Sequence, residues 1–317
     1  MVGRVSARPV AIVGSGAIGV AFAVLFARAG RPAAVFDIDE AALERGRADV
    51  RARLRLLADA GLLDEEPPVV AARIGWHTDA AAAARDAELV QECAPERADL
   101  KRDVLSRFAA VTPADAILAS STSAIAPSIL ADGLAPEIAA RVVVGHPGNP
   151  PYLLPVIEVV PSPVTASGVV DRAADVYRSA GLRPVLLRRE IEGFVFNRLQ
   201  GALLREAYCL VRDGIVDAAD VDEVVRSGLG RRWSIIGPFE TSDLNVRGGI
   251  AAHAERMGAS YARMGAERGQ HDPWTPDLVA RVEAERRAAL PLEDWDERVR
   301  WRDARLMALT PLWDAAS

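Results

Sequence analysis

One histidine of this chain stands where it could exchange a proton with a substrate. His146 directly follows the apolar run 141–145 and opens the segment His-Pro-Gly-Asn-Pro-Pro, whose prolines stiffen the backbone. Twelve residues later, Glu158 lies among apolar residues, where an unpaired carboxylate would be costly to bury. A carboxylate bonded to one imidazole nitrogen fixes the tautomer and stabilises the imidazolium that forms when the other nitrogen takes a hydroxyl proton. This spacing favours an acid/base pair; a histidine that only fills the core is the alternative.

A second group of residues has the pattern of a dinucleotide cradle. The apolar run 10–13 is followed by Gly14, Gly16 and Gly19 in a G-x-G-x-x-G sequence, and then by an apolar helical stretch, 20–29. The first glycine permits a tight turn, the second lets backbone amides approach a pyrophosphate, and the third lets the helix lie close to the strand. The helix N-terminus adds a partial positive charge. Taken alone, the glycines could also form no more than a tight turn.

Asp37 supports the cradle, because it ends the second apolar run, 33–37, eighteen residues after Gly19. There its carboxylate can accept hydrogen bonds from both hydroxyls of an adenosine ribose, and it would repel a 2′-phosphate. The sequence therefore predicts that the cofactor is NAD rather than NADP.

The elements that must position these residues follow a regular pattern. Up to about residue 189, short runs rich in Val and Ile alternate with longer stretches of helical period, as in a parallel sheet crossed by helices. We predict strands at 10–13, 33–37, 89–93, 116–120, 142–145, 156–160 and 184–187. The fold class is therefore α/β, with a doubly wound, mostly parallel Rossmann-type domain at residues 1–190. His146 would lie at the carboxyl edge of the sheet, where ligands of this architecture bind.

After residue 190 the pattern changes to helices alone. They are predicted at 194–211, 218–227, 249–264 and 276–289, and no β-rich run intervenes, so we expect an all-helical domain at residues 191–317 with a C-terminal extension. An apolar stripe would pack on the sheet domain or on a second copy of the chain, and it includes Leu199, Ala202, Leu203 and Ala207. The late tryptophans, expected to pack the core of the extension, are Trp274, Trp295, Trp301 and Trp313.

The composition argues against several classes of function. With a net charge of −6 and a pI of about 5.4, the chain has no global positive field that would gather nucleic acid or an anionic membrane. Cys93 and Cys209 are far apart and in no metal-ligand spacing, so we expect no metal site and no disulfide framework. No stretch has the pattern of a signal segment or a membrane span. The expected location is the cytoplasm.

The motifs together resemble those of the 3-hydroxyacyl-CoA dehydrogenase family. G-S-G-A-I-G, L-A-S-S-T-S, H-P-G-N-P with Glu158 after it, and G-F-V-F-N-R occur in that family's order and spacing. Longer stretches, among them H-P-G-N-P-P-Y-L-L-P and G-L-G-R-R-W-S-I-I-G-P-F-E-T, are most similar to the L-gulonate 3-dehydrogenase or lambda-crystallin branch. The resemblance covers nearly the whole chain. It implies a helical C-terminal domain like that of 6-phosphogluconate dehydrogenase, through which the chain would form a homodimer.

The resemblance also implies a role for each matching residue. His146 would be the acid/base and Glu158 its orienting carboxylate, while Ser123 and Asn197 would contact the substrate oxygens, as in an oxyanion site. The residues implied to bind the dinucleotide, besides the three glycines, are Ala17, Ile18, Asp37, Glu96 and Lys101. By position alone, Ser123 could instead cap a helix that begins at Ala124, and Asn197 could be an ordinary residue of a first helical turn. Glu96 and Lys101 could instead be solvated residues on the surface of the protein.

Arg231 and Arg232 bear on the substrate. Acyl-CoA members of the family have apolar residues where this chain has Arg231-Arg232-Trp233, and the gulonate branch is similar to this chain in having an arginine there. An arginine fork can bind a free carboxylate bidentately, whereas a thioester has no such charge. We therefore predict reversible, NAD-dependent oxidation of the 3-hydroxyl of a small L-3-hydroxy acid resembling L-gulonate.

Two other functions stay open. A basic stretch occupies the region where CoA-using relatives have their nucleotide contacts, although it could equally be a solvated helix face. It consists of Arg45, Arg47, Arg51, Arg53 and Arg55. The chain could thus be a 3-hydroxyacyl-CoA dehydrogenase of fatty-acid metabolism, acting on 3-hydroxybutyryl-CoA. A function of another class would be that of a crystallin-like structural protein that binds NAD and does little chemistry.

Overall fold

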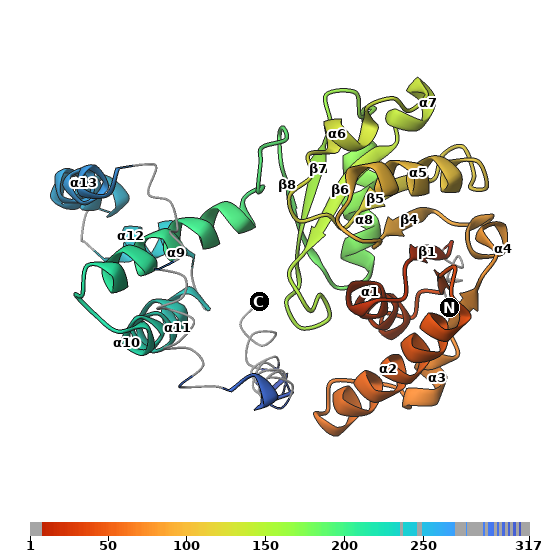
Figure 1. The fold of residues 1–317 in the computed structure, drawn as a ribbon, viewed down its shortest axis with the longest axis horizontal. Helices are drawn as coiled ribbons and strands as arrows, with labels where there is room; N and C mark the ends of the chain where they lie inside the picture. Colours follow the sequence, from red (N-terminus) through yellow and green to blue (C-terminus); the bar gives the residue numbers. More distant parts are fainter. Residues whose placement is uncertain are drawn as a thin grey trace. The chain divides into compact units, whose positions relative to one another are not determined.

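The computed structural model describes residues 8–234, 237–245 and 249–269, together with scattered positions between 277 and 311. The chain divides into two compact units, residues 1–197 and 198–317 (Figure 1). The boundary that the sequence places at residue 190 stays a prediction. The predicted helix 276–289 lies almost wholly outside the described residues, as do Trp274, Trp295 and Trp313.

The first unit is built on one eight-stranded sheet (Figure 1). Its strands are β1 (Val10–Val13), β2 (Ala33–Phe36), β3 (Ile74–His77), β4 (Leu89–Glu92), β5 (Ile117–Ser120), β6 (Val142–Pro147), β7 (Val156–Pro161) and β8 (Arg183–Leu186). Their order is β3-β2-β1-β4-β5-β6-β7-β8. All neighbouring strands pair in parallel except β6 and β7, which are antiparallel. The predicted doubly wound, mostly parallel sheet is confirmed.

Two details of the sheet differ from the prediction. The edge strand β3 was not predicted, because its sequence Ile-Gly-Trp-His has neither a Val/Ile run nor a clear alternation. In addition, β6 does not end at Gly145 but continues through His146 to Pro147. Because β7 pairs with it in antiparallel register, the ladder extends past the last apolar residue. His146 therefore belongs to the strand, whereas the sequence predicted that the strand ends one residue before it.

Helices cover both faces of the sheet. Those of the first unit are α1 (Ala17–Arg28), α2 (Glu40–Asp59), α3 (Pro67–Ala71), α4 (Ala80–Ala84), α5 (Ala98–Ala109), α6 (Pro127–Ala131), α7 (Pro136–Ala139) and α8 (Val169–Ser179). One face, which includes Ala11 and Val13 of β1, forms a core with α4, α5 and α6. Ile12 points to the opposite face, where Gly19 of α1 approaches it. Because β1 is buried on both faces, its sequence is continuously apolar.

The second unit contains helices only, as far as its residues are described. They are α9 (Phe196–Arg212), which begins in the first unit, α10 (Ala218–Glu223), the π-helix η1 (Val224–Leu229), α11 (Gly230–Trp233), α12 (Pro238–Leu244), α13 (Gly249–Arg268) and the 3₁₀ turn η2 (Leu292–Asp294). This confirms the predicted change to an all-helical pattern. In the described part of the chain, no helix combines the length and the apolar character needed to cross a membrane.

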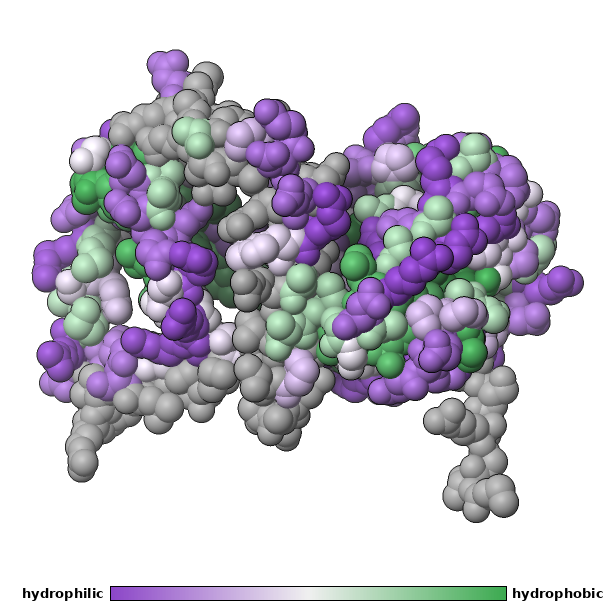
Figure 2. Space-filling view, turned by 90° about the horizontal axis from the view of Figure 1, so that it is seen from below, coloured by the Kyte–Doolittle hydropathy of each residue, from purple (hydrophilic) through white to green (hydrophobic). Residues whose placement is uncertain are grey.

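Many apolar side chains of the second unit reach the surface, and Figure 2 shows hydrophobic residues exposed among hydrophilic ones. On α9, the predicted stripe is exposed rather than buried: Leu199 is 62% exposed and Leu203 is 36% exposed. Ile215, just after α9, is 66% exposed. Trp301 is also exposed, which is contrary to the expected packing in a core. Within the described part of the second unit, this apolar stripe is therefore not buried.

Candidate active site

The glycine turn has the geometry of a phosphate cradle. β1 ends at Val13, and Gly14 then takes a positive φ of 103°, which L side chains rarely adopt. A Cβ at Gly19 would collide with the carbonyl oxygen of Gly14, so only glycine lets α1 start this close to the strand. Above Gly16 there is open space. Backbone amides at the start of α1 are thus accessible to an anion, which is the arrangement that a pyrophosphate requires.

Asp37 lies beside this turn at the end of β2. Its Oδ2 accepts hydrogen bonds from the backbone N of Ser15 (2.9 Å) and from Ser15 Oγ (2.7 Å), and its Oδ1 accepts one from the backbone N of Asp39 (3.2 Å). Burial alone would raise the pKa of Asp37, but these hydrogen bonds outweigh it and leave the pKa below its ordinary value. Asp37 is therefore a carboxylate at neutral pH. The part played by Ser15 was not predicted.

The turn and Asp37 line a cavity of about 720 Å³. Its other walls come from the start of α2 and from the segment after β4, where Cys93, Ala94 and Pro95 lie. An anion-accepting turn next to an ionised carboxylate, with room for an adenosine between them, fits a dinucleotide with free ribose hydroxyls. Of the residues that the sequence assigned to the cofactor, Gly14, Gly16, Ala17 and Asp37 line this cavity.

His146 and Glu158 face each other across the antiparallel strands β6 and β7. His146 Nδ1 lies 2.8 Å from Glu158 Oε2, and the two residues are only 7% and 2% exposed. Directly opposed residues of an antiparallel pair project to the same face, so the register alone brings them together. Within the described part of the chain, Nε2 of His146 makes no hydrogen bond to protein, which leaves it available to a substrate hydroxyl.

The second oxygen of Glu158 holds the start of α9. Oε1 accepts hydrogen bonds from the backbone N of Val195 (2.7 Å) and of Phe196 (2.9 Å). The chain enters this helix through Gly193 and the fully buried Phe194, both with positive φ, and the Phe194 ring lies 5.6 Å from the His146 ring. Burial would raise the pKa of Glu158, but His146 and the two amides outweigh it and lower the pKa. Glu158 is thus a fully satisfied buried carboxylate.

Ser123 and Asn197 are joined by a hydrogen bond, in which Asn197 Nδ2 donates to the carbonyl oxygen of Ser123 over 2.8 Å. Ser123 does not cap a helix, because α6 begins only at Pro127 and the hydroxyl that accepts from the following amides belongs to Thr122. The capping interpretation of Ser123 is therefore wrong. Asn197 is in the first turn of α9, but its amide reaches across to the loop after β5.

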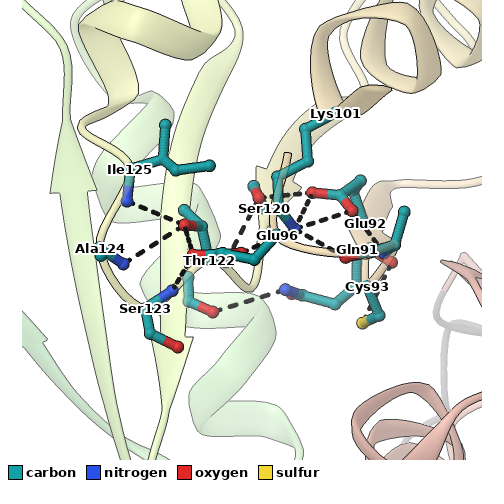
Figure 3. Close-up of polar contacts among 12 residues, drawn as sticks. Gln91, Glu92, Cys93, Glu96, Lys101, Ser120, Thr122, Ser123, Ala124 and Ile125 are labelled. Atoms are coloured by element: carbon teal, nitrogen blue, oxygen red, sulfur yellow. Dashed lines mark hydrogen bonds and ion pairs between the residues drawn. The ribbon is translucent and has the colours of Figure 1, made fainter. Parts of the chain in front are cut away.

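A buried ion pair that the sequence did not reveal lies next to this loop (Figure 3). Lys101 Nζ is 3.1 Å from both oxygens of Glu92, and the two residues are 1% and 0% exposed. Ser120 Oγ also donates to Glu92. The only sequence signal was the charged residue in the apolar run 89–93, which did not indicate its partner. The interpretation of Lys101 as solvated surface is wrong.

Glu96 lies between this pair and the loop (Figure 3). One of its oxygens accepts hydrogen bonds from Thr122 Oγ1 and from the backbone N of Ser123, the latter at 3.0 Å. The other lies 3.3 Å from Lys101 Nζ. Burial would raise the pKa of Glu96, but the Thr122 hydroxyl, Lys101 and the Ser123 amide outweigh it and lower the pKa.

The arginines singled out in the sequence are in two places. Arg231 and Arg232 are exposed on α11 of the second unit, where Arg232 donates to Asn245 Oδ1 over 3.4 Å. In the basic stretch on α2, three arginines form ion pairs with nearby carboxylates, Arg45 with Asp39, Arg47 with Glu40 and Glu44, and Arg53 with Asp49. Among the described residues, no cluster of His, Cys, Asp and Glu could hold a metal ion.

Comparison with known proteins assigns both halves of the chain. Models of the 3-hydroxyacyl-CoA dehydrogenase family match, with the NAD binding domain at residues 9–191 and the C-terminal domain at residues 193–291. The lambda-crystallin homolog of Bos taurus is 37% identical, covering 96% of this chain and 95% of that protein. The L-carnitine dehydrogenase of Streptomyces griseus is 38% identical, covering 84% of this chain and 76% of that protein.

The same likeness extends to solved structures. The crystal structure of an NAD⁺-dependent dismutase, the 5-dehydrogenase of 5-formyl-3-hydroxy-2-methylpyridine 4-carboxylic acid, superposes with a TM-score of 0.82 at 29% identity. The match covers 97% of this chain and 98% of that one.

Replacing Glu158 by Gln tests the electrostatics of the buried pair. Because the pKa of Glu158 is lowered on folding, its ionised form stabilises the fold above the ordinary pKa of 4.5, and this stabilisation is lost as the pH falls through the folded pKa. In urea denaturation, we expect Glu158→Gln to lose about 1–3 kcal/mol at pH 7, with a difference from wild type that shrinks below pH 4.5. Asp103→Asn, at an exposed position of α5, is the control. A difference that stays constant with pH would contradict the assignment.

Proposed function

The chain belongs to the 3-hydroxyacyl-CoA dehydrogenase family of NAD-dependent oxidoreductases that act on CH–OH groups, and on that premise we propose that it oxidises a small L-3-hydroxy acid resembling L-gulonate. The observation that carries the proposal is the buried His146–Glu158 pair, with Nε2 of the imidazole free in the described part of the chain. The pair is suited to take a proton from a hydroxyl.

In the proposed reaction, His146 Nε2 removes the proton of the 3-hydroxyl. The imidazolium that forms is stabilised by Glu158, whose oxygen is already 2.8 Å from Nδ1 and needs no rearrangement. NAD, when bound, accepts the hydride that leaves the same carbon. In the reverse direction, His146 returns the proton to the alkoxide oxygen. After oxidation, the imidazolium must release this proton to solvent before the next turnover, because oxidation of CH–OH by NAD yields one free proton.

Ser123 and Asn197 would hold the substrate oxygen. Ser123 is exposed, and its backbone is held by two hydrogen bonds. Its N–H donates to Glu96, and its carbonyl oxygen accepts from the Asn197 side chain. A hydroxyl on a fixed peptide can donate to a developing alkoxide without first being ordered. The Asn197 side chain would complete this contact from the first turn of α9.

The cofactor would lie in the cavity beside the glycine turn. Its pyrophosphate would be bound by the amides of Ala17 and Ile18 at the start of α1, over Gly14, Gly16 and Gly19. The adenosine ribose would be bound by Asp37, whose ionised carboxylate disfavours a 2′-phosphate. Glu96, with an exposed edge, would face the remainder of the dinucleotide.

Two observations support a free acid over a thioester. The related carnitine dehydrogenase and the similar pyridine carboxylic acid dehydrogenase are both named for substrates that have a carboxylate. On α2, three of the five arginines that could meet a CoA nucleotide are neutralised by carboxylates of that segment. Arg231 and Arg232 would bind the substrate carboxylate. The alternative function is that of a 3-hydroxybutyryl-CoA dehydrogenase, and the match to a family named for acyl-CoA substrates supports it.

A steady-state assay with NAD tests the reaction. The substrate panel contains L-gulonate, L-3-hydroxybutyrate, carnitine and 3-hydroxybutyryl-CoA. We expect NADH formation with at least one free acid, and a kcat about 10²–10⁴-fold lower in His146→Gln, because general-base catalysis contributes that factor. His253→Gln, on α13, should keep wild-type activity. If no substrate gives His146-dependent NADH formation, the chain is not this enzyme, and an NAD-binding structural role is favoured.

Arg232→Ala separates the two substrate classes. Loss of a charge-assisted contact to a carboxylate, worth about 1.5–3 kcal/mol, should raise KM for the free acid roughly 10- to 150-fold and leave KM for the CoA ester unchanged. The matched control is Arg226→Ala, an exposed arginine of η1. Tight use of CoA esters together with indifference to Arg232→Ala would favour the acyl-CoA enzyme.

We further propose that the chain is a homodimer formed through the apolar stripe of α9. Leu199 and Leu203 are one helical turn apart and exposed, so a second copy could bury both. Light scattering should give about twice the 33.9 kDa of one chain. The double variant Leu199→Glu, Leu203→Glu should shift the mass toward one chain, whereas Leu56→Glu, at a similarly exposed leucine of α2, should not. A wild-type mass of one chain at micromolar concentration would contradict the proposal.

A further inference from the structure

The hydroxyl of Ser15 is bonded to the carboxylate of Asp37. Asp37 Oδ2 accepts hydrogen bonds from Ser15 Oγ over 2.7 Å and from the backbone N of Ser15 over 2.9 Å. Ser15 lies between Gly14 and Gly16, at a position that the G-x-G-x-x-G pattern leaves open, so the turn itself does not require a hydroxyl there. The residue is nevertheless buried, with only 7% of it exposed. The contact that serine adds at this position is thus the one with Asp37.

Two segments hold the carboxylate of Asp37. Ser15, after β1, donates to Oδ2, and the backbone N of Asp39, after β2, donates to Oδ1 over the longer distance of 3.2 Å. Contacts to both oxygens fix the plane of the carboxylate. Among these donors, the Ser15 hydroxyl is the one that belongs to a side chain. A single substitution can therefore remove it while the backbone contacts of Ser15 and Asp39 stay.

A fixed carboxylate matters at a site that has to exclude one ligand as well as bind another. NADP differs from NAD by a phosphate on the adenosine 2′-oxygen, and a carboxylate repels that phosphate only as long as it cannot turn away. Arg45 lines the same cavity, its side chain is 71% exposed, and its ion pair with Asp39 is long at 3.4 Å. A guanidinium is a good partner for a phosphate. The cavity therefore contains a group that attracts NADP, and Asp37 must oppose it.

We propose that Ser15 is a positioning residue: its hydroxyl fixes Asp37 toward the adenosine ribose, and discrimination against NADP depends on this contact. The inference rests on the proposed function for the part that Asp37 plays at the ribose. Without the hydroxyl, the carboxylate can rotate, and Arg45 can then meet a 2′-phosphate. NAD has no charge at the 2′-oxygen, so its binding changes much less.

The test compares the dissociation constants of NAD and NADP, measured by isothermal titration calorimetry on the full-length chain. In Ser15→Ala, the ratio of the NADP constant to the NAD constant should fall at least about fivefold, because a charge-assisted contact between Arg45 and the phosphate becomes possible. The fall should come mostly from tighter binding of NADP, with the NAD constant changed less than about threefold. Ser106→Ala, at an exposed serine of α5, is the control and should keep the wild-type ratio. Neither constant depends on turnover.

Further variants identify the groups through which the hydroxyl acts. Asp37→Ala should lower the ratio more than Ser15→Ala does, and adding Ser15→Ala to it should change the ratio no further, because the hydroxyl has then lost its partner. Adding Arg45→Ala to Ser15→Ala should remove the gain in NADP affinity. If Ser15→Ala does not fold, Ser15→Cys replaces it, because a thiol is a weaker donor and should lower the ratio in the same direction.

Three results overturn the inference. An unchanged ratio in Ser15→Ala, or in the cysteine variant that replaces it, means that the hydroxyl has no part in selecting the cofactor. Equal weakening of NAD and NADP means that Ser15 supports the glycine turn under the pyrophosphate instead. A ratio that falls equally with and without the Asp37 carboxylate means that the hydroxyl acts by another route. If Asp37→Ala itself keeps the wild-type ratio, the proposed role of Asp37 is wrong, and the inference fails with it.

Discussion

Carboxylates buried at the carboxyl edge of the sheet are the constraint on which the site depends. Glu92 and Glu158 are 0% and 2% exposed, and a charge removed from water this far must be surrounded by donors. The donors come from other elements. Residues of α5 and β5 donate to Glu92, and residues of β6 and the start of α9 donate to Glu158. Satisfying two carboxylates therefore fixes four segments relative to one another within the first unit, and the proposed catalytic groups lie on those segments.

The change of strand direction gives the two ends of the site different character. Along β1, β2 and β4, parallel strands end beside helix starts and turns, which offer backbone amides and suit an anionic cofactor. Between β6 and β7 the pairing is antiparallel, so side chains from two strands meet directly and His146 opposes Glu158. One continuous sheet thus has a backbone-lined end, where we propose that the dinucleotide binds, and a side-chain-lined end, where we propose that the proton is transferred.

Local sequence predicted those features that depend on neighbouring residues. The glycine turn, Asp37 and seven of the eight strands follow from patterns within a few residues, and the His146–Glu158 pair from the cost of burying a carboxylate. What was missed depends on tertiary contacts. The partner of Glu92 lies on another element, and nothing in the sequence marks Lys101 as buried. The edge strand β3 depends on pairing with β2 more than on its own sequence. In the same way, His146 is in a strand because β7 pairs with it.

One oxygen of Glu158 is hydrogen-bonded to the imidazole of His146. The other accepts hydrogen bonds from two backbone amides at the start of α9, the helix that begins with Phe196 and Asn197. A mutation that altered the basicity of His146 through this carboxylate would also loosen the segment that carries Asn197. In the proposed mechanism, one residue, Glu158, therefore affects both the basicity of His146 and the placement of the substrate by Asn197. Under the proposed mechanism, a substitution at Glu158 cannot change the basicity of His146 without also disturbing the start of α9.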